Sequence, residues 1–208
     1  MIVFACYTFS RNMERGRIML KLNKVSKIYE GKVAYRALTD INLEVEDGEF
    51  VAIMGPSGSG KTTLLNIIST NDTPTTGTVE IDGKNPHLLK KSALAKFRRN
   101  ELGFIFQDFN LLHTLTVEEN IVLPLTLDGA RVKDMKEKAH QLAQSLGIEA
   151  IMKKRTYEIS GGQAQRVAIA RAMIHDPKLL LADEPTGNLD SKASKDVMNL
   201  LVSINERE

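Results

Sequence analysis

The amino-acid sequence predicts an α/β fold in which a parallel sheet is preceded by antiparallel strands and interrupted by a helical subdomain. The apolar run 50–54 predicts a buried strand, and a glycine-rich loop and a helix follow it directly. A second apolar strand is expected at 178–182. Between them, from about residue 92 to residue 153, the sequence changes to charged amphipathic helices. Strand, loop, helix and strand in this order are typical of a doubly wound parallel sheet.

Short strands separated by turns are predicted from Met19 to Val51. Residues 20–25 and 40–46 alternate as strands with one buried face do, and Asp47-Gly48 is a hairpin signal. These features predict an N-terminal antiparallel β subdomain. The other expected elements are a helix at 63–68, a strand at 77–83, helices at 118–127 and 135–146 inside a helical subdomain of about 90–160, and a helix at 163–174.

Composition restricts the class of protein. The chain has 208 residues, of which 42% are hydrophobic and 26% charged, as in an ordinary globular domain. A net charge of +2 gives no support for nucleic-acid binding through bulk charge. The single cysteine, Cys6, excludes an intramolecular disulfide and indicates a reducing compartment. No segment approaches the roughly 18 consecutive apolar residues of a membrane span, so work at a membrane would require a docking partner.

Residues 1–18 are expected to lie outside the fold. Residues 2–9 form a short apolar run without preceding basic residues or a following small-residue cleavage site, which makes a poor signal peptide. Strand-like alternation opens at Met19. We therefore expect one domain over 19–208, with residues 1–18 as a non-native or disordered extension.

The segment 55–62 fits the pattern G-x-x-x-x-G-K-[ST] at every fixed position, between a predicted strand and a predicted helix. Its backbone N–H groups and the helix N-terminus attract phosphate oxygens. Lys61 adds a charge for the β and γ phosphates, and Thr62 offers a hydroxyl to Mg²⁺. A glycine-rich turn with a chance lysine is the alternative, which the flanking elements disfavour. The expected nucleotide-binding residues here are Gly55, Pro56, Ser57, Gly58, Ser59, Gly60, Lys61, Thr62 and Thr63.

Two acids, Asp183 and Glu184, end the second apolar strand. Carboxylates at the C-terminal edge of a parallel sheet, beside a phosphate loop, are suited to hold Mg²⁺. Because neighbouring side chains of a strand point to opposite sides, the two acids can differ in role. Asp183 is expected to contact the metal and Glu184 to act as general base on the attacking water. A solvated strand end is the alternative, and the upstream phosphate loop weakens it.

A second glycine element, Ser160-Gly161-Gly162-Gln163, precedes another apolar helical run. Ser160 is suited to cap that helix, and the two glycines allow a backbone to approach an anion closely. A simple helix cap is the alternative. The four residues follow the phosphate loop and precede the acidic pair, and in that order they resemble the signature motif of the ABC-type ATPases.

Further segments extend the resemblance over about residue 19 to the end. Gln107, in Gly103-Phe104-Ile105-Phe106-Gln107, is similar to the Q-loop glutamine of the family, 187–190 resembles its D-loop, and Tyr29 resembles the aromatic residue that stacks on adenine. Ile159 and Ala164 depart mildly from the signature, where leucine and a longer polar residue are commoner. The resemblance implies a P-loop NTPase core of the ABC ATPase type.

The resemblance also implies a mechanism. Two copies pack head to tail around two ATP molecules, so that Ser160 and Gly162 of one copy reach the γ-phosphate held by the other. A separate integral membrane permease is the implied partner, which would hold the subunit at the cytoplasmic face of the membrane, and no nucleic-acid partner is expected. The implied ligands are ATP and Mg²⁺. The implied residues are Glu184, Lys61 and Gln107 for catalysis, Thr62, Gln107 and Asp183 for the metal, and Tyr29, Ser160, Gly161, Gly162, Gln163 and Asp190 for the nucleotide.

Within the family, residues 104–112, 115–120 and 124–125 resemble bacterial exporters of the macrolide and lipoprotein-releasing type, and the bacitracin-type peptide-resistance ATPases most. The leading hypothesis is therefore the ATPase subunit of such an exporter. A regulatory subunit of the cell-division type, which hydrolyses little ATP, is the second. Soluble ABC ATPases of translation or DNA repair fit badly, because they carry two cassettes or a long coiled-coil insertion.

Two further expectations come from the resemblance. The family has a switch histidine after the strand that follows the acidic pair, but His87, His113, His140 and His175 all precede Glu184. That strand and its histidine are expected to be missing, which should leave part of the sheet unpaired. The permease-docking surface is expected to include the apolar residues around Gln107, namely Phe106, Phe109, Leu111 and Leu112. The alternative is that some of them belong to the core of the helical subdomain, which is expected for at least Phe106.

Overall fold

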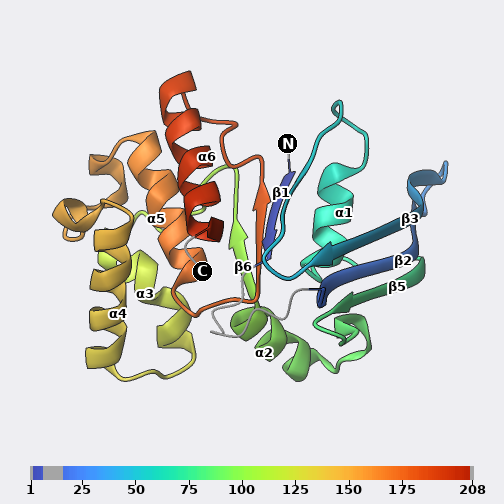
Figure 1. The fold of residues 1–208 in the computed structure, drawn as a ribbon, viewed down its shortest axis with the longest axis horizontal. Helices are drawn as coiled ribbons and strands as arrows, with labels where there is room; N and C mark the ends of the chain where they lie inside the picture. The colour runs from blue at the N-terminus through green and yellow to red at the C-terminus, as the bar shows by residue number, and fades with distance from the viewer. Residues whose placement is uncertain (1, 7–15, 207–208) are drawn as a thin grey trace.

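The computed structural model describes residues 2–6 and 16–206. A mixed sheet stands in the middle of the molecule, with α1 on one side and α5 and α6 on the other (Figure 1). The strands are β1 (Ile2–Cys6), β2 (Ile18–Tyr29), β3 (Tyr35–Glu46), β4 (Phe50–Ile53), β5 (Thr76–Ile81), β6 (Leu102–Ile105) and β7 (Leu179–Asp183). The helices are α1 (Lys61–Ile68), α2 (Lys91–Glu101), α3 (Val117–Leu127), α4 (Val132–Ser145), α5 (Gly161–Met173) and α6 (Ser191–Glu206), with short 3₁₀ turns η1 (Pro86–Leu88), η2 (Glu149–Ile151) and η3 (Thr156–Glu158).

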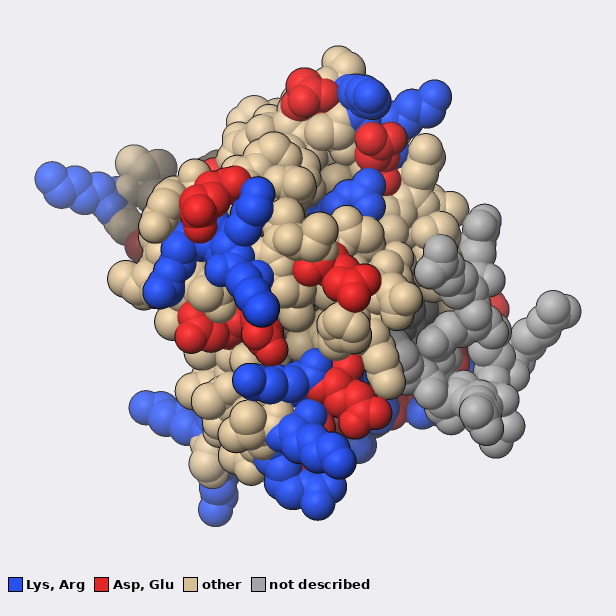
Figure 2. Space-filling view, turned by 90° about the vertical axis from the view of Figure 1, so that its left-hand side faces the viewer, with Lys and Arg blue, Asp and Glu red and all other residues tan. Residues whose placement is uncertain are grey.

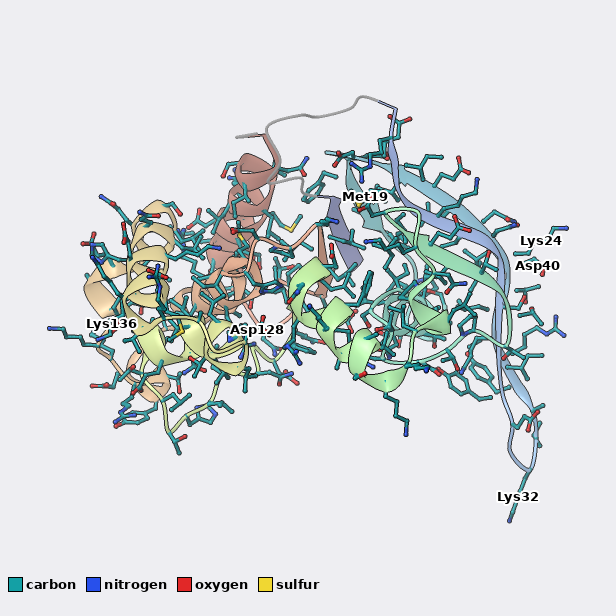
Figure 3. The ribbon with its side chains drawn as sticks, turned by 90° about the horizontal axis from the view of Figure 1, so that it is seen from below. Met19, Lys24, Lys32, Asp40, Asp128 and Lys136 are labelled. Carbon is teal, nitrogen blue, oxygen red and sulfur yellow. The ribbon has the colours of Figure 1, made fainter. Side chains whose placement is uncertain are left out.

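The N-terminal antiparallel subdomain is confirmed. Strands β3, β2 and β5 form a sheet in that order, and β2 pairs antiparallel with both neighbours. The β2–β3 hairpin carries Lys32 at its tip, which projects away from the body of the molecule (Figure 3).

The central sheet has the order β4-β1-β7-β6. Strands β6 and β7 are parallel, and β1 is antiparallel to both β4 and β7. Strands β4 and β7 therefore run in the same direction on either side of β1. This arrangement confirms an α/β fold with parallel strands, but with an antiparallel strand inside the sheet.

The expectation that residues 1–18 lie outside the fold is wrong for residues 2–6 and 18. Ile2–Cys6 forms a strand between β4 and β7 and pairs with both. The facing edges of β4 and β7 carry backbone N–H and C=O groups, and an extended segment between them satisfies these groups. Ile18 already begins β2. Residues 1 and 7–15 lie outside the described part of the chain, so the expectation for them stays a prediction.

Strand β4 is less buried than expected. It lies at the edge of the central sheet, so only one of its sides is covered by a neighbouring strand. Phe50, Val51 and Ile53 are half-buried, whereas Ala52 and Met54 are exposed. The prediction of a strand at 50–54 is confirmed, but the prediction that it is buried is wrong. Apolar composition does not distinguish an edge strand from a central one.

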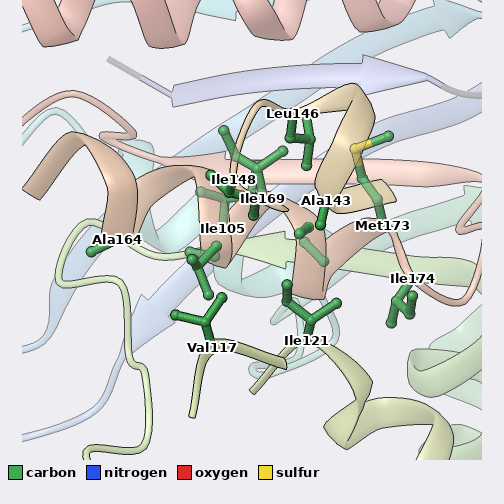
Figure 4. Packing of buried hydrophobic residues seen from close by; sticks show 14 of the residues in the cluster. Ile105, Val117, Ile121, Ala143, Leu146, Ile148, Ala164, Ile169, Met173 and Ile174 are labelled. Carbon is green, nitrogen blue, oxygen red and sulfur yellow. The ribbon is translucent and has the colours of Figure 1, made fainter. Parts of the chain in front are cut away.

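Two hydrophobic clusters fill the molecule. One joins α3, α4, α5 and α6 to one face of the central sheet, and Figure 4 shows how Val117, Ile121 and Ile169 meet within it. The other lies between the antiparallel sheet, α1 and the opposite face of the central sheet. Phe97 of α2 and Leu102 of β6 belong to the second cluster, so the segment expected as one helical subdomain, about 90–160, divides its side chains between both.

Charge is mixed over the surface formed by the helical side. Lys and Arg side chains are interspersed with Asp and Glu across this face (Figure 2). On α4, Lys133 and Lys136 are exposed while Met135 and Ala139 are buried, which is the pattern of an amphipathic helix. Within the described ranges, no helix has the length and apolar character needed to cross a membrane.

A network around Asp82 ties the two sheets together. Its carboxylate, which follows β5, accepts hydrogen bonds from Arg17 and from Lys178, and Lys178 Nζ lies 2.8 Å from Asp82 Oδ2 and 2.9 Å from Glu101 Oε2. The Asp82 side chain is only 12% exposed. Burial acts to raise the pKa of Asp82, but the hydrogen bonds from Lys178 and Arg17 outweigh it and hold the pKa below its usual value.

We expect Asp82→Asn to reduce the free energy of unfolding at pH 7 by about 1–2 kcal/mol, because charge-assisted hydrogen bonds are lost. A carboxylate with a lowered pKa stabilises the folded state above the unfolded pKa of about 3.9, and this stabilisation is lost as the pH falls through the folded value. In urea unfolding measurements, the difference in stability between the chain and its variant should therefore shrink as the pH falls from about 5 to about 2.

Asp134→Asn serves as the control, since Asp134 pairs with Arg131 on the exposed surface of α4. Little change is expected there at any pH. A stability difference for Asp82→Asn that is the same at both ends of the pH range would contradict this interpretation of the network.

Candidate functional site

The phosphate loop between β4 and α1 leaves the helix N-terminus open. Gly60 is the N-cap of α1, with a φ of 88° and no side-chain capping hydrogen bond. The first N–H groups of α1 therefore lack a capping side chain and are available to an anion. Lys61 Nζ donates to the carbonyl oxygens of Gly55 and Pro56, at 2.9 Å each, so its ammonium lies across the loop.

Two tyrosines of the antiparallel subdomain lie opposite one another, and one of them, Tyr35, contacts this loop. Tyr29 and Tyr35 are cross-strand partners of β2 and β3. Tyr29 Oη donates to Asp72 Oδ2 at 2.9 Å, and Lys27 Nζ lies 4.9 Å from the centre of its ring. Tyr35 Oη donates to the carbonyl of Gly58 at 3.3 Å. Sequence reasoning singled out Tyr29 and missed Tyr35, although the hairpin register opposite Tyr29 could have indicated it.

Asp183 ends β7, and Glu184 follows in the left-handed region with a φ of 45°. Burial raises the pKa of Asp183, and the negative charge of Glu184 raises it further, while the Lys61 ammonium acts in the opposite direction. The loop lysine is thus within electrostatic range of the strand-end carboxylate. Gln165 Nε2, fully buried in α5, donates to the carbonyl of Pro185 at 2.7 Å and fixes the chain directly after the acidic pair.

Gln107 lies against the segment 187–190. A Cβ atom on Gly187 would come within 2.8 Å of Gln107 Nε2, so the amide occupies the space that a larger residue would need. Asn188 Nδ2 donates to the carbonyl of Gln107 at 3.2 Å and to Asp108 Oδ1 at 2.7 Å. The structure therefore brings the two segments together.

Ser160 caps α5 through a capping box. Its Oγ accepts from Gln163 N at 3.3 Å, and Gln163 Oε1 accepts from Ser160 N at 3.0 Å. Asp190 caps α6 in a similar way, since its Oδ1 accepts from the N–H groups of Lys192 and Ala193 at 2.9 Å. A shallow hollow of about 240 Å³ lies between the two helix starts, lined by Ser160, Gly162, Gln163, Arg166, Asp190, Lys192, Ala193, Asp196 and Val197.

The expected exposed apolar cluster after Gln107 is only partly present. Leu112 is 46% exposed, but Leu111 is buried, so the expectation is wrong for Leu111. Phe109 is half-buried and packs on the helical cluster. Phe106 is half-buried against Phe104, with the ring centres 4.3 Å apart. The apolar side chains of this loop cover the helical cluster, and Leu112 is the one among these four that is exposed.

Comparisons with known proteins agree with this arrangement. A family model described as ABC transporter matches residues 38–187. The ABC transporter ATP-binding protein YxdL of Bacillus subtilis is 62% identical over 187 residues, which cover 90% of this chain and 73% of that protein. The bacitracin export ATP-binding protein BceA of Halalkalibacterium halodurans is 49% identical, over 91% of this chain and 75% of that protein.

Solved structures give the same result. A dimeric structure of MJ0796, a bacterial ABC transporter cassette, matches with a TM-score of 0.80 and 44% identity, covering 90% of this chain and 83% of that one. A dimer of the same cassette in a post-hydrolysis state bound to ADP and phosphate has a TM-score of 0.80 and 43% identity, with the same coverage. The protein MJ0796 comes from Methanocaldococcus jannaschii.

The two left-handed glycines of the phosphate loop allow a matched test. A Cβ at Gly60 would meet the carbonyl oxygen of Ala37 at 2.6 Å and Leu38 Cδ2 at 2.9 Å, whereas a Cβ at Gly58 would meet nothing within 4 Å. Gly58→Ala should cost about 1–2 kcal/mol for the left-handed backbone alone. Gly60→Ala should cost about 1–3 kcal/mol more, because backbone or core atoms must also move. Urea unfolding of both variants measures the difference, and equal stabilities would contradict the described packing of Gly60.

Proposed function

The chain belongs to the ABC transporter family as an ATP-binding subunit, and we propose that it binds and hydrolyses ATP with Mg²⁺ to power a separate membrane permease. The observation that carries the proposal is the uncapped N-terminus of α1, whose loop holds Lys61 within electrostatic range of Asp183. Strands β4 and β7 end at the same edge of the sheet, so the positively charged loop and the strand-end carboxylate share that edge, as phosphoryl transfer requires. A nucleotide phosphate at α1 would offer Lys61 a stronger acceptor than the carbonyls of Gly55 and Pro56.

The oxygen donors expected as metal ligands suit a hard divalent cation. Thr62 is exposed at the start of α1, Asp183 is a half-buried carboxylate, and Gln107 offers an amide oxygen. These three side chains are the residues that would hold Mg²⁺, as the family resemblance implies. When bound, Mg²⁺ would neutralise charge that develops on the β and γ phosphates.

We assign Glu184 as the general base that polarises the attacking water. Its left-handed backbone turns the chain sharply after β7, and the hydrogen bond from Gly187 N to its carbonyl, at 2.9 Å, stabilises that turn. The negative charge of Glu184 still acts on the neighbouring Asp183, whose pKa it helps to raise. Tyr29 remains our candidate for stacking on adenine, and Tyr35 becomes a second one through its hydrogen bond to Gly58.

We propose that two copies pair head to tail, so that Ser160, Gly162 and Asp190 of one copy close the nucleotide site of the other. The hollow at the starts of α5 and α6 supports this idea, because Ser160, Gly162 and Asp190 line it together. The dimeric structures of MJ0796 support it further. Gly161 and Gln163 shape the same turn.

We propose a permease partner from the family and from the names of the relatives. Such a partner would hold the chain at the cytoplasmic face of the membrane. The bacitracin export ATP-binding protein BceA favours export of, or resistance to, a peptide antibiotic, with macrolide or lipoprotein-like substrates as the other members of this class.

Lys61→Ala is the direct test of the proposed function. Loss of the ammonium that faces the phosphates should weaken binding of Mg-ATP by on the order of a hundredfold, because a charge-assisted contact is worth about 1.5–3 kcal/mol. Titration with a fluorescent ATP analogue measures the affinity. Lys133→Ala, which removes an exposed lysine of α4, is the control and should bind as the parent does. Unchanged affinity in Lys61→Ala would refute the assignment of the phosphate loop.

Leu112→Glu tests the docking surface. Leu112 is exposed beside Gln107, so a charge there should disrupt contact with an apolar permease surface without disturbing the core. Capture of an integral membrane protein from detergent-solubilised membranes by the tagged chain measures association, and at least a tenfold loss is expected (about 1.4 kcal/mol). Leu88→Glu is the matched control, since Leu88 is 82% exposed on η1 in another part of the molecule. Equal capture by both variants would exclude Leu112 from the docking surface.

A further inference from the structure

The loop after β6 contains two consecutive residues in a strained conformation. Phe109 has a φ of 59° and Asn110 a φ of 49°, and neither is glycine. Left-handed backbone is unfavourable for residues with a Cβ atom, and phenylalanine adopts it rarely. Such a pair persists only where surrounding groups hold it.

Arg171 holds this pair. Its guanidinium, on the last turn of α5, donates to the carbonyl of Asn110 and, at 2.7 Å, to the carbonyl of Phe109. The planar fork of arginine suits two neighbouring acceptors, which lysine could not match. The Arg171 side chain is half-buried, and this burial lowers its pKa.

The side chain of Phe109 extends the contact toward the other end of α5. A Cβ atom on Gly161, the first residue of α5, would lie 4.0 Å from Phe109 Cζ and 3.4 Å from Leu189 Cδ2. The carbonyl of Phe109 is thus held by a side chain from the last turn of α5, while the ring of Phe109 reaches the Ser160–Gly162 turn at the N-terminal end of the same helix. Leu189, two residues after Gly187, meets the same turn.

We propose that Arg171 is a positioning residue, which holds Phe109 along α5 so that the Ser160–Gly162 turn and Asp190 keep the geometry that a second copy of this chain requires. This inference rests on the proposed function, since it concerns the pairing of two copies around ATP. Arg171 itself contacts carbonyl oxygens of its own chain, and it acts through Phe109.

Loss of the guanidinium would leave the carbonyls of Phe109 and Asn110 without this donor, and the two residues would relax toward ordinary backbone conformations. The Phe109 ring would then leave Gly161 and Leu189. The contacts that α1 and its loop make with a nucleotide in a single copy would not change, because these elements lie on the opposite side of the central sheet from α5 (Figure 1).

The test uses the full chain with Glu184→Gln, in which the proposed general base is removed and bound ATP persists. Analytical ultracentrifugation with saturating Mg-ATP gives the dimer dissociation constant, and a fluorescent ATP analogue gives the affinity of the monomer. Adding Arg171→Ala should weaken the dimer about tenfold or more, since two charge-assisted hydrogen bonds are lost. The affinity of the monomer for the analogue should stay that of the parent. Arg171→Lys retains the charge and can reach one carbonyl. Its dimer dissociation constant should therefore lie between that of the Glu184→Gln chain and that of the chain with Arg171→Ala.

Arg99→Ala is the matched control, because Arg99 pairs with Asp128 on the surface and its loss should leave dimerisation unchanged. A lowered melting temperature with parental dimerisation in both Arg171 variants would mean that the residue only stabilises the fold, and would overturn the inference while leaving the proposed function intact. If Arg171→Ala does not fold, Arg171→Lys decides by the same two measurements. Failure of the Glu184→Gln chain to dimerise with ATP would overturn the proposed pairing and this inference together.

Discussion

Strand β7 is buried on both faces, and the rest of the structure depends on it. Leu179 and Leu181 point into the cluster beneath the antiparallel sheet, while Leu180 and Ala182 point into the helical cluster. Each side chain is at most 2% exposed. Burial of a leucine side chain stabilises the folded state by about 1.5–3 kcal/mol, so this short strand connects two cores that would otherwise be separate. Its register fixes where the chain emerges as Asp183 and Glu184.

Because β7 is fixed in this way, the acidic pair has a defined position relative to the phosphate loop of β4. The two strands run in the same direction and are separated by β1, so their C-terminal ends lie at the same edge of the sheet. Lys61 affects the pKa of Asp183 across this edge. The position of the site therefore depends on the shared direction of β4 and β7 and on the burial of β7. The loops that follow these strands supply the chemical groups.

The sequence predicted the parts of the site that are local in the chain. The phosphate loop, the Ser160 capping box and the strand that ends in two acids each carry their pattern within a few consecutive residues. Arg171 was not predictable, because a basic residue in the last turn of a helix ordinarily needs no explanation beyond the helix dipole. The pairing of Ile2–Cys6 was also missed, since its partners Phe50–Ile53 and Leu179–Asp183 are far away in the chain. Burial of Leu111 and exposure of Ala52 likewise depend on which elements lie alongside them.

One helix, α5, supports the residues of the site that have a left-handed backbone. Glu184, Phe109 and Asn110 are left-handed residues with side chains, in the two loops that flank the carboxyl edge of the sheet. Helix α5 anchors both loops, through Gln165 to the carbonyl of Pro185 and through Arg171 to the carbonyls of Phe109 and Asn110. Since α5 also begins at Ser160, a shift of that helix changes the support of both loops at once. The two loops and the Ser160 turn therefore share one support, the largely buried helix α5.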